Sequence, residues 1–97
     1  MAALFYLSCS LLMPHFVYIL QSEKDGRYYI GETHDIGGRV AFHNAGLQRS
    51  TRSRIPFKLL YVEQWPNRGE ALKREKEIKN YKGGRSFKKL LEGSSPA

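Results

Sequence analysis

Two short apolar runs separated by an Asp-Gly pair constrain the fold more than any other feature of this sequence. Residues 16–20 (FVYIL) and 28–31 (YYIG) are rich in aromatic and β-branched side chains, and Asp25-Gly26 lies between them. Asp-Gly in this position indicates an antiparallel hairpin, because both residues tolerate the positive φ values of a tight turn. We therefore predict paired strands at about 15–22 and 27–33.

A helix and a third strand are expected next. Asp35 can cap a helix over residues 35–46, which Asn-Ala-Gly at 44–46 would end. A polar loop over residues 47–56 follows. The run from Phe57 to Trp65 has an apolar centre and predicts a strand.

Two further helices are predicted near the end of the chain. Asn67 can cap a helix over residues 68–81, and Gly83-Gly84 breaks it. Ser86 can cap a last helix at about 86–92. The predicted order is β-β-α-β-α-α. It describes an α+β domain with a small, three-stranded, mostly antiparallel sheet and helices on both of its faces.

The two ends of the chain are expected to lie outside this domain. Residues 1–12 are uncharged, too short to span a bilayer, and have no basic segment or small-x-small cleavage site. We expect residues 1–13 to be an artefactual or disordered extension before a domain at 14–92, with a frayed tail at 93–97. A membrane-tethering segment is the alternative for the extension. Without a secretory signal, a cytoplasmic location is expected.

The charge balance indicates a polyanionic partner. The chain has 16 Lys and Arg against nine Asp and Glu, a net charge of +7. Such an excess can neutralise phosphates, although many small basic proteins use it only for solvation. Cys9 is the only cysteine, which excludes an intrachain disulfide framework or thiolate zinc site. The candidate nucleic-acid-binding residues are Arg49, Arg52, Arg54, Lys73, Lys79, Lys82 and Arg85.

Glu75 is the first candidate for chemistry. In the predicted helix 68–81, Ala71, Leu72 and Ile78 define an apolar face, and Glu75 falls within the same arc. A carboxylate on a buried face costs free energy unless a cation compensates it. Either a divalent metal ion or a structural arginine could compensate Glu75, and the sequence pattern alone does not decide between them.

Arg39 and His43 form the second candidate pair. They are four residues apart on one predicted helix and share a face. An arginine can grip a phosphate and a histidine can move a proton, but a solvated face explains an isolated pair equally well. Tyr18 and Tyr29 lie on the predicted hairpin, where tyrosines are usually packing residues.

Together these motifs resemble the GIY-YIG endonuclease superfamily. Phe16-Val17-Tyr18 stands for the GIY half and Tyr29-Ile30-Gly31 matches the YIG half. Arg39 follows Tyr29 by ten residues, as the family's arginine follows its tyrosine. Residues 70–75 (EALKRE) resemble the family helix that carries the metal-binding glutamate. The likeness runs from about residue 16 to residue 91. It is closest to small single-domain bacterial members and similar to the N-terminal nuclease domain of the excision-repair incision enzyme.

The resemblance implies a metal-dependent DNA endonuclease that acts in DNA repair or processing. One divalent cation, Mg²⁺ or Mn²⁺, would be held by Glu75, waters and the scissile phosphate. Arg39 would stabilise the phosphate charge. Tyr18 or Tyr29, with His43 nearby, would activate the attacking water, and which of them is the base stays open.

Several alternatives remain at this point. Phe16 replaces the first glycine of the family motif, and Gly37-Gly38 lie before Arg39 where relatives carry polar helix formers. A nucleic-acid-binding module without catalysis, or a basic structural protein, is therefore also considered. Because no separate DNA-reading domain is evident, branched, single-stranded or unselected DNA is the expected substrate. A homodimer or a targeting partner is left open.

Overall fold

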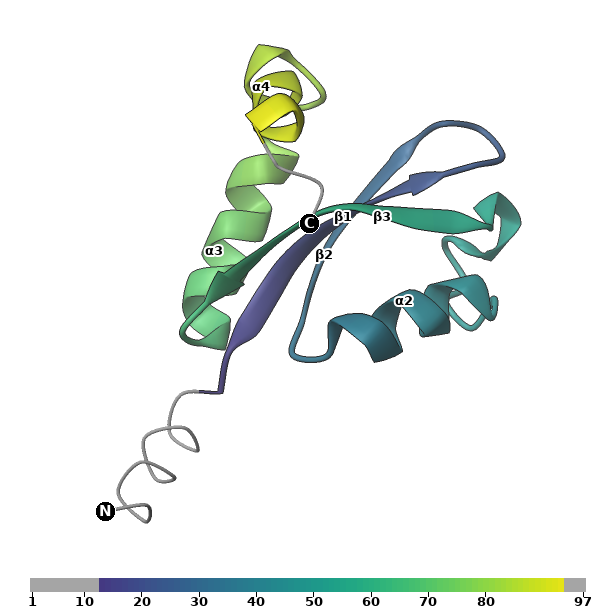
Figure 1. Cartoon of the computed structure of the whole chain (residues 1–97), viewed down its shortest axis with the longest axis horizontal. Coiled ribbons are helices and arrows are strands. Elements are labelled where there is room, and N and C mark those ends of the chain that lie inside the picture. Colours follow the sequence, from purple (N-terminus) through teal and green to yellow (C-terminus); the bar gives the residue numbers. More distant parts are fainter. Residues whose placement is uncertain (1–12, 94–97) are drawn as a thin grey trace.

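Three antiparallel strands form one sheet in the order β2-β1-β3 (Figure 1). The computed structural model describes residues 13–93, so most of the predicted extension and tail lies outside the described residues. The strands are β1 (His15–Ser22), β2 (Tyr28–Thr33) and β3 (Phe57–Trp65). β1 is the central strand, because it pairs with both neighbours, and its residues 17–20 are buried.

Helices cover both faces of the sheet, as predicted. Helix α2 (Ile36–Asn44) lies on one side, and helices α3 (Arg68–Lys79) and α4 (Arg85–Gly93) lie on the other (Figure 1). Alternate residues of β1 therefore belong to two cores. Val17 and Ile19 pack with α3 and α4, whereas Tyr18 and Leu20 pack on the α2 side.

Two of the three predicted N-caps are confirmed, whereas the Ser86 cap is wrong, because α4 begins at Arg85 and Ser86 lies inside it. Asp35 accepts a hydrogen bond from the backbone N–H of Gly38 (3.1 Å), and Asn67 accepts one from Glu70 (2.9 Å). Gly46 takes a φ of +77° just after α2, a conformation that glycine adopts without strain. Helix α3 ends at Lys79, two residues before the prediction, and the loop at 47–56 contains a short 3₁₀ helix, η1 (Arg52–Arg54).

One predicted core position is wrong. Leu72 was expected on the buried face of α3, but it is 41% exposed, while Ala71 and Ile78 are fully buried. Arg74 is half-buried instead, so the sheet-facing side of α3 includes a charged side chain that the apolar pattern does not reveal. Among the residues that the structure describes, no helix is long and apolar enough to cross a membrane.

Candidate active site

Tyr18 lies at the centre of a polar cluster on the α2 face of the sheet. Its side chain is 2% exposed, and its ring lies 6.3 Å from the ring of Tyr29. Gly31 pairs with Tyr18 across the β1–β2 ladder. A Cβ at Gly31 would fall on the Tyr18 hydroxyl, well inside van der Waals contact. The glycine of the Tyr-Ile-Gly motif therefore makes the space that the phenol occupies.

His43 connects Tyr18 to α2. Its Nε2 lies 3.2 Å from the Tyr18 hydroxyl, and its Nδ1 lies 3.0 Å from the hydroxyl oxygen of Thr51. The Thr51 hydroxyl donates to the carbonyl oxygen of Gln48, so it accepts from Nδ1–H of His43. This tautomer leaves Nε2 as an acceptor for the Tyr18 O–H. We call Tyr18, Tyr29, His43 and Thr51 the Tyr18 cluster.

Burial sets the protonation state of this cluster. It raises the pKa of Tyr18 well above its usual range, and the adjacent Tyr29 adds to the effect. Burial also lowers the pKa of His43, which is 1% exposed, and the nearby Arg39 charge lowers it further. Both rings are therefore neutral at neutral pH, with a donor on Tyr18 facing an acceptor on His43.

Arg39 is half-buried and has little to compensate its charge. Its guanidinium carbon lies 4.9 Å from the centre of the Phe42 ring, a cation–π contact. Among residues 13–93 it forms no ion pair with a carboxylate. Its positive charge also lowers the pKa of Tyr18, against the effect of burial. The guanidinium is thus available to an anion that approaches the tyrosine.

Glu75 comes to the same region from the opposite helix layer. Its side chain is only 15% exposed, whereas Glu77 on the same helix is 58% exposed. Its negative charge acts on the pKa of Tyr18, which it raises. The carboxylate lies 2.7 Å from Nζ of Lys79, one turn along α3. Within the described chain, no three His, Cys, Asp or Glu side chains gather around a metal-sized site.

The candidate nucleic-acid-binding residues come from separate elements of the fold. Arg49 and Arg52 are exposed in the loop after α2, Lys82 is exposed after α3, and Arg85 is exposed at the start of α4. Arg54 is engaged within the fold, because it pairs with Asp25 (3.3 Å) and donates to the carbonyl oxygen of Tyr28 (3.3 Å). Lys79 is held by Glu75. The exposed cations therefore divide between the two sides of the sheet.

A second polar cluster lies on the α3 face. Glu63 accepts hydrogen bonds from the Trp65 indole (2.7 Å) and from Nε of Arg74 (2.7 Å), and also from the Tyr61 hydroxyl. Arg74 donates onward to Glu77 (2.8 Å) and Tyr81 (3.3 Å). We call these six residues the Glu63 cluster. Burial opposes ionisation of Glu63, but its donors outweigh this effect and lower its pKa.

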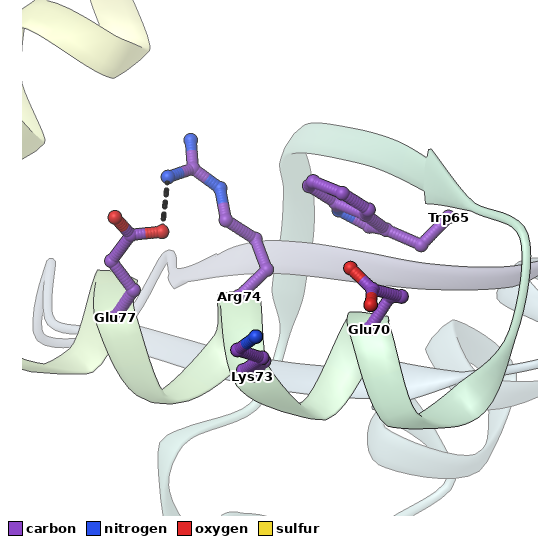
Figure 2. A pocket seen from close by; sticks show the side chains of 5 residues that line it. All are labelled: Trp65, Glu70, Lys73, Arg74 and Glu77. Atoms are coloured by element: carbon purple, nitrogen blue, oxygen red, sulfur yellow. Dashed lines mark hydrogen bonds and ion pairs between the residues drawn. The ribbon is translucent and has the colours of Figure 1, made fainter.

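A shallow cavity of ≈ 300 Å³ adjoins the Glu63 cluster. Figure 2 shows Arg74 turned toward Glu77, Trp65 beside the same helix, and Lys73 on the adjoining turn. Glu70 and Lys73 complete the lining, which therefore has two acidic and two basic side chains. Arg74 is paired with Glu77, and the predicted phosphate contact, Lys73, shares this lining with two carboxylates.

Three elements of these clusters were absent from the sequence-based prediction. Thr51 becomes a partner of His43 only because the loop after α2 folds back, and no local pattern indicates this. The space over Gly31 likewise depends on strand register. The Glu63–Arg74 pair did have an indicator, because Tyr61, Glu63 and Trp65 alternate along β3 and therefore share one face.

Comparisons with known proteins agree with this architecture. A family model for the GIY-YIG catalytic domain matches residues 14–88. A UPF0213 protein of Staphylococcus epidermidis is 42% identical over 80 residues, which cover 81% of this chain and 96% of that protein. A UPF0213 protein of Staphylococcus saprophyticus is 40% identical with the same coverage. The NMR structure of a UPF0213 protein from Bacillus halodurans has a TM-score of 0.50 and 34% identity, over 87% of both chains. These matches confirm the resemblance and the predicted fold.

Proposed function

Because this chain belongs to the GIY-YIG family of catalytic domains, we propose that it is a metal-dependent endonuclease that hydrolyses DNA phosphodiester bonds. One observation carries the proposal. Arg39 and Glu75 come from helices on opposite faces of the sheet, and the charges of both act, together with that of Glu32, on the pKa of the Tyr18 phenol. A cation, a carboxylate and a hydrogen-bonded phenol in one region supply the groups that phosphodiester hydrolysis requires.

We assign the handling of the proton to the Tyr18 cluster. Burial raises the pKa of Tyr18, so its phenol is neutral and is not present as a phenolate that could act alone as base. Its O–H faces the acceptor Nε2 of neutral His43, and its oxygen lone pairs can accept from an attacking water. A proton leaving that water would pass to Tyr18 as the Tyr18 proton moves to His43. Thr51 fixes the required tautomer, and Tyr29 packs on the imidazole with 4.8 Å between ring centres.

Arg39 and Glu75 have complementary roles in this proposal. Arg39, with no carboxylate partner in the described chain, would bind a non-bridging oxygen of the scissile phosphate as its charge grows. Glu75 is a single hard oxygen ligand, which fits Mg²⁺ or Mn²⁺, since such ions keep several waters and bind few carboxylates. The ion, when bound, would stabilise the leaving 3′ oxygen. Lys79 contacts one of the two Glu75 carboxylate oxygens, so the ion would compete with it.

The substrate is expected to be branched, single-stranded or unselected DNA, handled in repair or processing. The exposed cations can contact phosphates, but such contacts carry no sequence information. A cytoplasmic location and a homodimer or targeting partner remain part of the same hypothesis.

The direct test is cleavage of supercoiled plasmid and labelled branched DNA by the purified chain. We expect nicking that requires Mg²⁺ or Mn²⁺, stops with chelator, and falls by about a hundredfold or more in Glu75→Ala. Glu70→Ala is the matched control, because Glu70 lies on the same helix and is exposed. Cleavage by Glu75→Ala at the wild-type rate, or cleavage that persists in chelator, would contradict the assignment.

A DNA-binding module without catalysis is the second candidate, and the Lys79–Glu75 ion pair favours it. A carboxylate held at 2.7 Å by an ammonium is already neutralised without any metal. This alternative predicts salt-sensitive DNA binding with no cleavage under any metal condition. Binding that is unchanged in Glu75→Ala would then accompany the absence of nicking.

A further inference from the structure

A basic groove with an aromatic wall lies beside Glu75, on the α3 and α4 side of β2. Its cavity volume is ≈ 520 Å³, within the range of pockets that take small ligands. The β1–β2 turn contributes Gly26 and Arg27, and β2 contributes Tyr28 and Ile30. The opposite wall is formed by Lys79 at the end of α3, by Lys82 and Gly83, and by Phe87 of α4.

The lining of this groove has cationic side chains and no acidic one. In the described chain, Arg27 and Lys82 form no ion pair, and Lys79 is shared with Glu75. The nearest acid of the hairpin turn, Asp25, is engaged by Arg54 (3.3 Å) and by the Arg27 backbone N–H (2.9 Å). The groove therefore presents uncompensated positive charge suited to phosphate groups.

Tyr28 gives the groove a stacking surface. The residue is 42% exposed although it lies within a strand. Its ring is fixed in place by Phe87, with 4.9 Å between ring centres and an angle of 68° between the planes. An edge-on contact of this kind supports the tyrosine without covering both of its faces. A nucleobase can stack on an open aromatic face whatever its sequence, provided that it is not paired in a duplex.

The backbone around the groove is also specialised. Lys82 has a φ of +51°, the one positive value outside glycine in residues 13–93. A side chain in this region costs free energy that glycine would avoid. The sequence nevertheless retains a lysine here, next to Gly83 (φ +71°), where its ammonium can reach the groove.

We infer that this groove is a binding site for an unpaired nucleotide of the DNA strand being cut, with its base stacked on Tyr28 and its phosphates held by Arg27, Lys79 and Lys82. The inference rests on the proposed function and narrows its substrate to DNA with a single-stranded segment beside the scissile bond. Lys79 connects the two sites, because it lines the groove and contacts Glu75. A strand held in the groove therefore continues toward Glu75, and its phosphate draws Lys79 away from the carboxylate.

The test is binding in chelator, so that no cleavage is needed. The ligands are a labelled oligodeoxythymidine of about ten nucleotides and a blunt-ended duplex of two strands, measured by fluorescence anisotropy. We expect Tyr28→Leu, which keeps an apolar contact with Phe87, to weaken single-strand binding about tenfold and to leave duplex binding within about twofold. Tyr28→Phe should bind both ligands as the wild type does. A 2-aminopurine in the strand should lose fluorescence on binding to the wild type and to Tyr28→Phe, but not to Tyr28→Leu.

Lys82→Gly provides a variant that does not strain the fold, because glycine suits the positive φ. It should weaken single-strand binding and reduce the slope of log affinity against log salt by about 0.7, the loss of one phosphate contact. Equal losses for both ligands in Tyr28→Leu, or no single-strand binding by the wild type, would overturn the inference. Metal-dependent nicking of duplex plasmid would survive either result, so failure of this inference is distinct from failure of the nuclease assignment.

Discussion

The two faces of the sheet each hold a half-buried arginine near a tyrosine, and the two arginines differ in what surrounds them. On the α3 face, Arg74 is paired with Glu63 and Glu77 and also donates to Tyr81. These partners raise the pKa of Arg74 even though burial opposes its charge. On the α2 face, Arg39 has only the Phe42 ring, and in the described chain no carboxylate pairs with it.

The presence or absence of a carboxylate partner distinguishes a charge with a structural role from a charge available to a ligand. A buried charge whose donors are all satisfied stabilises one conformation and has no remaining capacity for a ligand. A buried charge without a counterion destabilises the free protein, and this cost is relieved when an anion binds. By this criterion the Glu63 cluster has a structural role and stabilises the packing of α3 on the sheet. Arg39, beside the Tyr18 cluster, has a binding role and would pair with a phosphate.

The sharpest test replaces each arginine by methionine, which keeps the aliphatic stem and removes the charge. Arg39→Met should reduce DNA cleavage by about 10²–10³-fold, the usual loss when one donor to developing charge is removed. Its free energy of unfolding should not fall by more than about 0.5 kcal/mol, since no ion pair is lost. Cleavage kinetics and urea unfolding of the same preparation measure both quantities. An Arg39→Met protein that cuts normally would remove Arg39 from the mechanism.

Arg74→Met should show the opposite behaviour. Removing Arg74 leaves Glu63 with only its Tyr61 and Trp65 donors, and we expect a loss of about 2 kcal/mol, below the range for fully buried pairs because both side chains are partly exposed. In a domain of this size the melting temperature should fall by roughly 10 °C. Cleavage per folded molecule should be retained. A stable but inactive Arg74→Met protein would mean that the two arginines have been assigned the wrong way round.

Gly31→Ala asks whether the Tyr18 cluster depends on the space beside the phenol. The new methyl group would collide with the Tyr18 hydroxyl, so either the ring or the strand must shift, at a cost of about 1–2 kcal/mol. Because the hydroxyl would leave His43, cleavage should also fall. Gly37→Ala is the matched control. No atom lies within 4 Å of its new Cβ, and alanine should stabilise the helix by about 0.5–1 kcal/mol. Equal stabilities for the two variants would show that the space is not required.

The sequence predicted local structure well and long-range partners poorly. The Asp25-Gly26 turn and the Asp35 and Asn67 caps depend on neighbouring residues, and the structure confirms all three. Leu72 was placed on the wrong side because apolar periodicity weighs its side chain above that of Arg74. The true face carries a charged residue whose partner, Glu63, is eleven positions earlier. Periodicity contains no information about such a pair.

In the candidate site, too, the sequence predicted the main residues but not their partners. Family motifs and spacing selected Tyr18, Tyr29, Arg39, His43 and Glu75, but not Thr51, which fixes the His43 tautomer from eight residues away. They also could not show that Lys79 holds Glu75, because many i, i+4 pairs of this kind are equally compatible with a solvated helix face. Geometry was needed to separate these cases.

The smallest expected effect is a pH dependence that distinguishes the two clusters. His43 has a lowered pKa, so below its ordinary value of 6.5 the unfolded chain binds a proton that the folded chain does not. Stability should therefore begin to fall as the pH drops through 6.5. Glu63 also has a lowered pKa, but its contribution is complete above the ordinary glutamate value of 4.5 and is lost only as the pH falls through the folded value. The change in unfolding free energy between about pH 7 and about pH 5 should thus come from His43 and not from Glu63.

Three variants test this assignment by urea unfolding. His43→Gln should flatten the dependence of the unfolding free energy on pH in that range, whereas Arg74→Met should lower stability throughout the range and keep the slope. His34→Gln, at an exposed position, is the histidine control and should also keep the slope. If His43→Gln retains the wild-type slope, the imidazole is not held neutral by the fold, and the proton acceptor proposed for Tyr18 is lost with it.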